Sequence, residues 1–332
     1  MSAQQSIPCL DFSLFLTGTE EEKQSLCKVL LKGFKDFGFV KLMKHGISDD
    51  SIQELFNWNK RFFSLDEDIK MKAPHPPEAN PHRGYSSVGQ EKLSMVKDYE
   101  KGGEREVTEV RDLKESFDLG PPDDEMFPNI WFDDSHLPGF KLFMQSFYEC
   151  CSGVHSNILC ALEMALQLPP NTLKKRCNIN CSELRLNHYP ACRVDDLREG
   201  VTNRISEHTD FGTLTLLFQD AVGGLEIEDQ KNPGVYLPVK QDNSTEMIVN
   251  VGDCLQRWTN DVLRSASHRV QLPPGFKEDR VLDRYSAAYF GKPNRDQSVA
   301  ALEQFISDEQ PQRYDPNMTA LQYNQKKLSL TY

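Results

Sequence analysis

Hydrophobic residues in the first 180 positions recur mostly every three or four residues, which is the spacing of helices that bury one face. The first such stretch follows Thr19 and Glu22, which have the three-residue spacing of a capping box, and we expect it to end at Gly38. Shorter apolar runs between the helical stretches predict strands. The elements predicted for this half are strands at 7–12 and 39–43 and helices between 19 and 38, over 50–65 and over 138–168.

The loop insert 66–136 has a different composition, rich in proline, glycine and charged residues. Loops of this length inside a compact chain are uncommon and often serve as lids or binding loops. Two apolar islands, at 83–86 and 115–119, interrupt the segment, and we expect each of them to form a short edge strand.

From 181 to 293 the pattern changes to short apolar runs separated by turn residues, which is typical of a β-sandwich or a barrel. Because helices precede this run of strands, we expect a single domain over 1–332, mainly β, with α-helices packed outside a barrel. In this division 1–180 is the N-terminal helical and strand region, 181–293 is the barrel core and 294–332 is a C-terminal segment. The predicted strands are 184–189, 213–218, 225–228, 236–238, 247–251, 262–265, 269–272 and 285–290.

The composition excludes several classes of partner. Thirty-eight Lys and Arg against fifty Asp and Glu give a net charge of −12, and no basic block interrupts the acidic excess. We therefore expect no binding to nucleic acid or to an anionic membrane surface. The N-terminus lacks the features of a secretion signal, and no stretch reaches the roughly 20 apolar residues of a membrane span. We expect a cytoplasmic protein with a small-molecule substrate, no obligate protein partner and nine scattered, reduced cysteines.

The first candidate for chemistry is the pair His208 and Asp210. In a β-strand, residues two apart point to the same face, so this imidazole and this carboxylate could hold two adjacent positions on one metal ion. His268, further along the chain, is the candidate for a third ligand. Two histidines and one carboxylate on one face of the ion are the ligand set of non-haem Fe(II) oxygenases.

Two further polar pairs share the same spacing: Asn187 with Tyr189, and Arg284 with Ser286. If all three pairs face the barrel interior, six polar groups meet in an apolar cavity, where they are costly without partners. A guanidinium beside a hydroxyl is suited to a carboxylate, which it binds through two parallel hydrogen bonds. Arg185 shares the face of Asn187 and is an alternative carboxylate contact, although an arginine at a strand end is more often solvated.

The motifs at these positions together resemble the isopenicillin N synthase-like branch of the Fe(II)- and 2-oxoglutarate-dependent dioxygenases. The resemblance covers about residues 7 to 295 and implies a double-stranded β-helix, or jelly-roll, barrel core. The matching motifs are His208-Thr209-Asp210, His268-Arg269-Val270 and Arg284-Tyr285-Ser286, supported by Asn187-His188-Tyr189-Pro190, Gly223-Gly224-Leu225-Glu226-Ile227, Asn250-Val251-Gly252-Asp253, His45-Gly46-Ile47 and Arg83-Gly84-Tyr85.

The resemblance also implies roles for individual residues. His208, Asp210 and His268 would bind Fe(II). Arg284 and Ser286 would bind the distal carboxylate of the cosubstrate 2-oxoglutarate. The remaining pair, Tyr189 and Asn187, would help to hold the cosubstrate in position. The implied reaction consumes O2, converts 2-oxoglutarate to succinate and oxidises a C–H bond of the substrate.

The primary substrate is the least specified feature. We expect it to contact five residues, four of them aromatic, which favours a small aromatic or planar metabolite. The chain resembles fungal members of the family that modify secondary metabolites, including by oxidative ring expansion, or that oxidise pyrimidine methyl groups. The expected substrate contacts are Tyr85, Phe117, Phe211, Tyr289 and Arg193.

Three alternatives remain at this level. One is an oxidase of the same fold that uses no 2-oxoglutarate, against which Arg284 and Ser286 argue. Another is a barrel that binds a metal or ligand without turnover. The third is a structural interaction protein, which has no use for three inward polar pairs.

Overall fold

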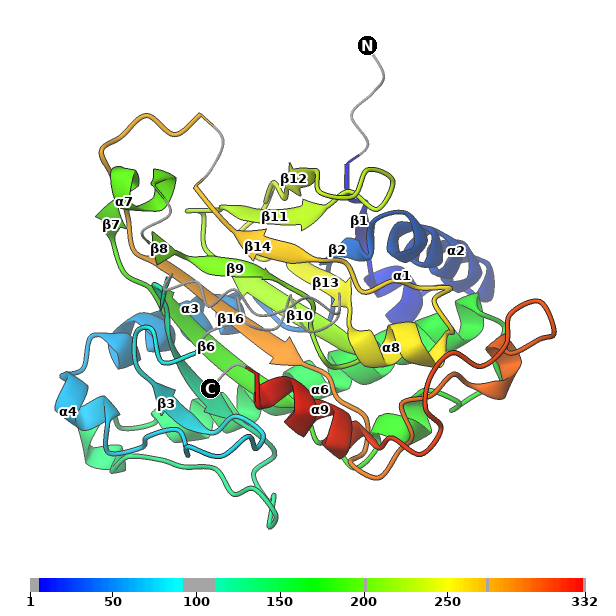
Figure 1. Cartoon of the computed structure of the whole chain (residues 1–332), viewed down its shortest axis with the longest axis horizontal. Coiled ribbons are helices and arrows are strands. Elements are labelled where there is room, and N and C mark those ends of the chain that lie inside the picture. Colours follow the sequence, from blue (N-terminus) through cyan, green and yellow to red (C-terminus); the bar gives the residue numbers. More distant parts are fainter. Residues whose placement is uncertain (1–5, 92–110, 200–201, 273–274, 331–332) are drawn as a thin grey trace.

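The computed structural model describes residues 6–91, 111–199, 202–272 and 275–330. Its core consists of an eight-stranded and a four-stranded sheet, with helices packed on the outside of the larger sheet (Figure 1). The larger sheet runs, in spatial order, β1 (Cys9–Asp11), β2 (Phe39–Met43), β13 (Met247–Val251), β10 (Leu214–Gln219), β16 (Arg284–Phe290), β6 (Glu183–Tyr189), β5 (Glu115–Leu119) and β3 (Gly84–Ser86). The smaller runs β12 (Tyr236–Pro238), β11 (Leu225–Glu228), β14 (His268–Val270) and β9 (Ile205–His208).

The helices follow the predicted pattern closely in the N-terminal half. The capping box at Thr19 is present, because its side chain accepts from the amide of Glu22 while Glu22 accepts from the amide of Thr19. Gly38 ends the helix in the left-handed conformation, with φ of 72°. The longer helices are α2 (Glu20–Phe37), α3 (Asp49–Phe63), α6 (Phe140–Ala165) and α9 (Ala320–Leu328), and the shorter ones are α1 (Ser13–Leu16), α4 (Glu67–Lys70), α7 (Val194–Arg198) and α8 (Asp253–Trp258).

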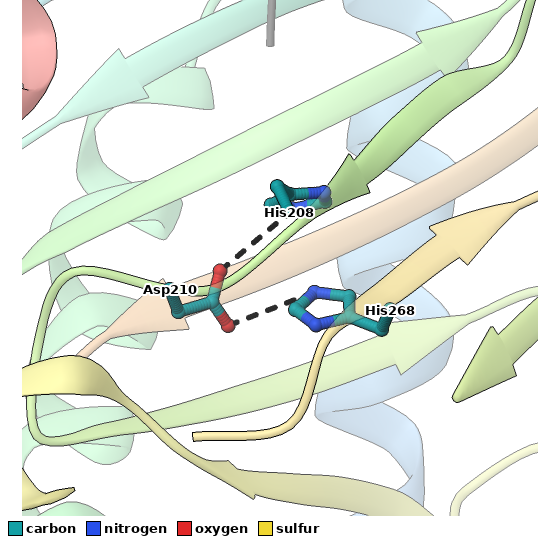
Figure 2. Close-up of side chains that lie close together, drawn as sticks. All are labelled: His208, Asp210 and His268. Carbon is teal, nitrogen blue, oxygen red and sulfur yellow. Dashed lines mark ion pairs between the residues drawn. The ribbon is translucent and has the colours of Figure 1, made fainter. Parts of the chain in front are cut away.

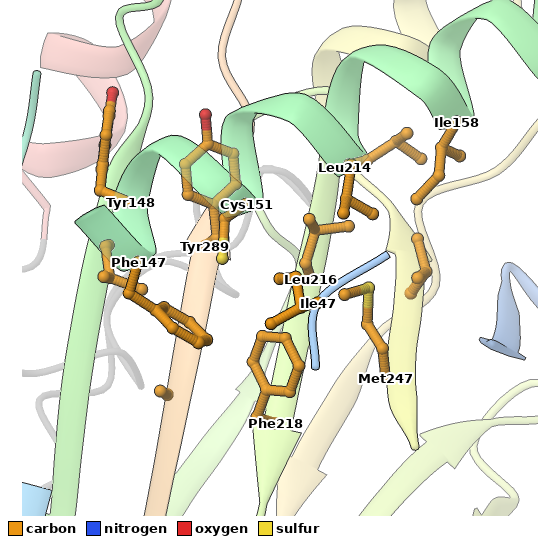
Figure 3. Close-up of a cluster of buried hydrophobic side chains, with 14 of the residues drawn as sticks. Ile47, Phe147, Tyr148, Cys151, Ile158, Leu214, Leu216, Phe218, Met247 and Tyr289 are labelled. Carbon is orange, nitrogen blue, oxygen red and sulfur yellow. The ribbon is translucent and has the colours of Figure 1, made fainter. Parts of the chain in front are cut away.

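Helix α6 packs on the larger sheet and buries its apolar stripe there. Phe147 meets Phe218 of β10 edge-on at 5.5 Å, and Tyr148 meets Tyr289 of β16 in the same way at 5.4 Å between ring centroids. Figure 3 shows these rings between the helix and the strands, beside Leu214 and Leu216. Because α6 covers one face of β10 and β16, the polar side chains of these strands point from the opposite face into the interior.

Two strand predictions are wrong. The run 262–265 forms no strand, because side chains bind its backbone: Thr259 Oγ1 accepts from the amide of Leu263, and Gln256 Oε1 accepts from the amide of Ser265. The island 115–119 is a strand but not an edge strand, since β5 pairs with β3 on one side and β6 on the other.

Two further pairs of strands are short. They are β7 (Cys192–Arg193) with β15 (Arg280–Val281), and β4 (Arg111–Asp112) with β8 (Thr202–Asn203). In the described part of the chain, no helix is long and apolar enough to cross a membrane.

Candidate active site

The side chains of His208, Asp210 and His268 lie close together and point toward one another (Figure 2). His208 ends β9 and His268 begins the neighbouring β14, where the two residues are paired directly across the strands. The Nε2 atoms of the histidines lie 3.9 Å and 3.8 Å from the two carboxylate oxygens of Asp210. One potential ligand atom from each residue lies within 4.8 Å of the other two, so a single metal ion can bridge all three.

The orientation of both imidazoles suits a metal ligand. His208 Nδ1 lies 2.9 Å from the carbonyl oxygen of Ser206, and His268 Nδ1 lies 3.2 Å from that of Ala266. Because a carbonyl can only accept, each Nδ1 carries the proton and donates. Each Nε2 therefore keeps its lone pair for a metal, which is the usual arrangement around ligating histidines.

Asp210 lies in the loop after β9 and not in the strand, so strand alternation does not explain its position. Its backbone carbonyl accepts from the amide of Asp253 at 2.7 Å. Its Oδ2 accepts from Thr215 Oγ1 at 2.6 Å and from Asn250 Nδ2 at 2.7 Å. These bonds fix the carboxylate plane and leave Oδ1 as the oxygen most available to a metal.

Protonation states in the triad agree with this role. Burial, with a further contribution from the neighbouring His268, lowers the pKa of His208 to about 4, so the imidazole is neutral near pH 7. Burial alone would raise the pKa of Asp210, but His268, His208 and the two donated hydrogen bonds lower it below its usual value. A charged carboxylate and a neutral imidazole are the forms that bind Fe(II).

The two other predicted pairs lie together on β6 and β16. The register places Ser286 opposite Asn187 and Arg284 opposite Tyr189. Arg284 is buried, lies over the Tyr189 ring at 4.8 Å and donates from Nη1 to Ser286 Oγ at 3.4 Å. The structure thus assembles a guanidinium, a hydroxyl and an amide on one inward face, as the spacing predicted.

Beside the triad lies a small cavity of about 50 Å³ with charged walls. Arg185 binds Asp118 at 2.7 Å and Glu91 at 2.9 Å, so the weaker sequence-based alternative, an inward Arg185, is the one that the structure adopts. Lys292 binds Glu183 at 2.6 Å. The lining residues are His82, Glu91, Glu183, Arg185, His208, Thr209, Asp210, Phe211, Gly212, Phe290 and Lys292.

Of the five expected substrate contacts, only Phe211 lines this cavity. Tyr85 and Phe117 pack in the aromatic core around Phe62, and Tyr289 packs against α6. Arg193 lies at the surface with 70% of its side chain exposed and pairs with Asp195. These four residues therefore do not line the cavity beside the triad, and their role as substrate contacts stays a prediction.

Comparison with known proteins agrees with this geometry. Residues 180–293 match the family model described as the 2OG-Fe(II) oxygenase superfamily, and residues 7–134 match the model of the N-terminal region of non-haem dioxygenases in morphine synthesis. The chain is 53% identical to the 2-oxoglutarate-Fe(II) type oxidoreductase ppzD of Metarhizium rileyi, over 99% of this chain and 92% of that protein. The chain belongs to the 2OG-Fe(II) oxygenase superfamily.

Two more known proteins are similar to this oxygenase. The proline hydroxylase buaE of Petromyces alliaceus is 51% identical, over 97% of this chain and 98% of that protein. A full-length Neurospora crassa protein, crystallised in complex with alpha-KG and thymine, has a TM-score of 0.87 and 31% identity, and the match covers 100% of this chain and 99% of that chain. The protein is thus an Fe(II)- and 2-oxoglutarate-dependent oxygenase with a jelly-roll core.

Proposed function

We propose that this oxygenase hydroxylates a small zwitterionic amino acid of the proline type. In this proposal His208, Asp210 and His268 hold the iron, and the inward groups on β6 and β16 hold 2-oxoglutarate. Bound Fe(II) and O2 supply the oxidation, in which 2-oxoglutarate is converted to succinate and CO2 while one oxygen atom enters a C–H bond. The cosubstrate-binding residues are Arg284, Ser286, Tyr189 and Asn187.

The observation that carries the substrate class is the charge of the cavity wall. Arg185 and Lys292 supply positive charge, and Glu91 and Glu183 supply negative charge, beside the triad. Burial alone would raise the pKa of Glu91, but Arg185 and Lys114 hold it well below its usual value, so this wall stays ionised. A zwitterion offers one charged group to each sign of charge, and these groups can add charge-assisted hydrogen bonds to the ion pairs that Arg185 and Lys292 already form with Glu91 and Glu183, which an apolar metabolite cannot do.

Similarity to a proline hydroxylase supports the same class. The relatives reported above come from fungi, which supports the expected place in fungal-type secondary metabolism.

A second candidate is hydroxylation of a pyrimidine methyl group. Phe211 and Phe290 both line the cavity and could contact the faces of a planar ring. The structural similarity to the Neurospora crassa protein that was solved with thymine supports this candidate.

One assay separates the two. The protein is incubated with Fe(II), 2-oxoglutarate and O2 together with L-proline, L-pipecolate or thymine, and succinate and product mass are measured. We expect a cyclic amino acid to raise succinate formation and to gain one oxygen atom. Turnover of thymine with no response to either amino acid would contradict the proposal and favour the second candidate.

A further inference from the structure

Arg204 is a buried arginine that the reaction as described does not use. It directly precedes β9 and is 0% exposed. Its Nη2 donates to the carbonyl oxygen of Leu282 at 2.5 Å, two residues before Arg284. Its Nε and Nη1 are buried and have no hydrogen-bond partner among the residues that the structure describes. An interior guanidinium with two unpaired donors is costly, which points to a ligand that pairs with them.

Arg284 lies close enough to Arg204 to lower the pKa of its guanidinium. Burial and, after it, the neighbouring Arg284 lower the pKa of Arg204, while Cys192, Tyr189 and Asp220 act in the opposite direction. Two like charges in one interior region destabilise the protein unless an anion lies between or beside them. In the described part of the chain, the hydrogen bonds of both arginines go to neutral acceptors.

Arg284 has few donors left for a bound carboxylate. Its Nε donates to the carbonyl of Gly223 at 3.0 Å, and its Nη2 donates to Gln219 Oε1 at 2.8 Å. Because a guanidinium has five N–H groups in a fixed plane, these two bonds occupy one edge of it. A carboxylate has about four lone-pair sites and can accept from further donors. Around the same group, Gln219 Nε2 and Asn187 Oδ1 also lack hydrogen-bond partners in the described part of the chain.

We propose that Arg204 is a second cationic contact for the distal carboxylate of 2-oxoglutarate, in addition to Arg284. Arg204 thereby sets the preference for a 2-oxo acid that carries a charged tail. This inference rests on the proposed assignment of Arg284 and Ser286 as the distal-carboxylate site. The alternative is that Arg204 only anchors the backbone at Leu282.

Binding measurements on the metal-loaded protein under anaerobic conditions separate these roles. The ligands are 2-oxoglutarate and 2-oxopentanoate, which has a methyl group in place of the distal carboxylate. We expect Arg204→Met to weaken 2-oxoglutarate binding at least about tenfold and to change 2-oxopentanoate binding by less than about twofold. Arg204→Lys keeps the charge and should lose less affinity. Thermal unfolding without ligand should show Arg204→Met at least as stable as the parent, since a repelled, unpaired charge is removed.

Two results would overturn the inference. One is an unchanged dissociation constant for 2-oxoglutarate in Arg204→Met. The other, which covers an Arg204→Met protein that does not fold, is a neutral Arg204→Gln protein that binds 2-oxoglutarate as tightly as the parent does. Arg284→Met is the matched control: if it too left 2-oxoglutarate binding unchanged, the assignment of the distal-carboxylate site would fail. If Arg284→Met weakened binding and the Arg204 variants did not, only the role of Arg204 would be rejected.

Discussion

Asn250 Nδ2 donates a hydrogen bond to Asp210 Oδ2 at 2.7 Å, from the middle of the sheet to the loop that carries the carboxylate. Such bonds orient a metal ligand, and their loss typically reduces metal affinity about 10- to 100-fold. We therefore expect Asn250→Ala to raise the dissociation constant for Fe(II) by about that factor while the fold is kept. Anaerobic iron titration measures the effect. Asn57→Ala, at an exposed position on α3, is the control and should bind iron as the parent does.

Gly212 lies where two backbone segments approach too closely for a side chain. A Cβ at this position would lie 2.2 Å from the carbonyl oxygen of Gly291, a rigid backbone atom. We expect Gly212→Ala to lower the free energy of unfolding by about 1–3 kcal/mol, because overpacking forces the backbone apart. Since Asp210 is two residues away, iron affinity should fall as well.

Gly153 provides the matched control for that substitution. It is exposed in the middle of α6, and a Cβ there meets no atom of the described residues within 4 Å. Gly153→Ala should stabilise the protein by about 0.5–1 kcal/mol, since alanine loses less backbone entropy in a helix. Chemical denaturation of both variants tests the pair, and equal effects at the two positions would show that close packing at Gly212 is not the cause.

His155 predicts a pH dependence of stability. It is buried beneath β10, and its Nε2 lies 2.8 Å from Thr213 Oγ1, whose hydroxyl donates to Gly291. Burial lowers the pKa of His155 from 6.5 to about 4. The unfolded chain therefore binds this proton first as pH falls, and the stability that neutral His155 contributes above pH 6.5 is lost down to about pH 4.

The variant His155→Gln isolates this contribution, because it keeps a donor and removes the titration. The difference in unfolding free energy between the parent and the variant should shrink by up to about 3 kcal/mol between about pH 7 and pH 4. Urea denaturation at a series of pH values measures it. A difference that is constant with pH would show that another group carries the acid sensitivity.

Phe290 and Phe211 are expected to contact the substrate and so to influence which substrate the protein prefers. Both line the cavity, and Phe290 follows Arg284 and Ser286 on the inward face of β16. We expect Phe290→Leu to raise KM for the preferred substrate several-fold, with iron and 2-oxoglutarate binding unchanged. Tyr289→Phe is the neighbouring control on the opposite face and should leave KM as it is. Competition between substrates read by mass spectrometry checks both.

The sequence predicted the inward-facing polar side chains best where both members of a pair lie on the same strand. The two-residue spacing of Arg284 and Ser286 on β16, and of Asn187 and Tyr189 on β6, is the period of a strand. The same alternation places Phe290 with Arg284 and turns Tyr289 towards α6. The expected substrate contacts were chosen for aromatic character and did not use this alternation, and Phe290, which lines the cavity, was not among them.

Other parts of the site depend on contacts between distant segments. Asp210 is positioned by Asn250 and Thr215, and Glu91 reaches the cavity from the loop insert. Periodicity within one segment carries no information on such contacts. Arg204 is a similar case, since its missing partners become visible only when its burial and its neighbour Arg284 are known.

The central claim is that His208, Asp210 and His268 hold the iron on which turnover depends. Its most direct test measures bound iron per protein and succinate formation for Asp210→Ala, with Asp220→Ala, outside the triad, as control. We predict that Asp210→Ala binds no stoichiometric iron and forms no succinate, while the control retains iron. A folded Asp210→Ala protein with normal iron content and normal succinate production would contradict the claim.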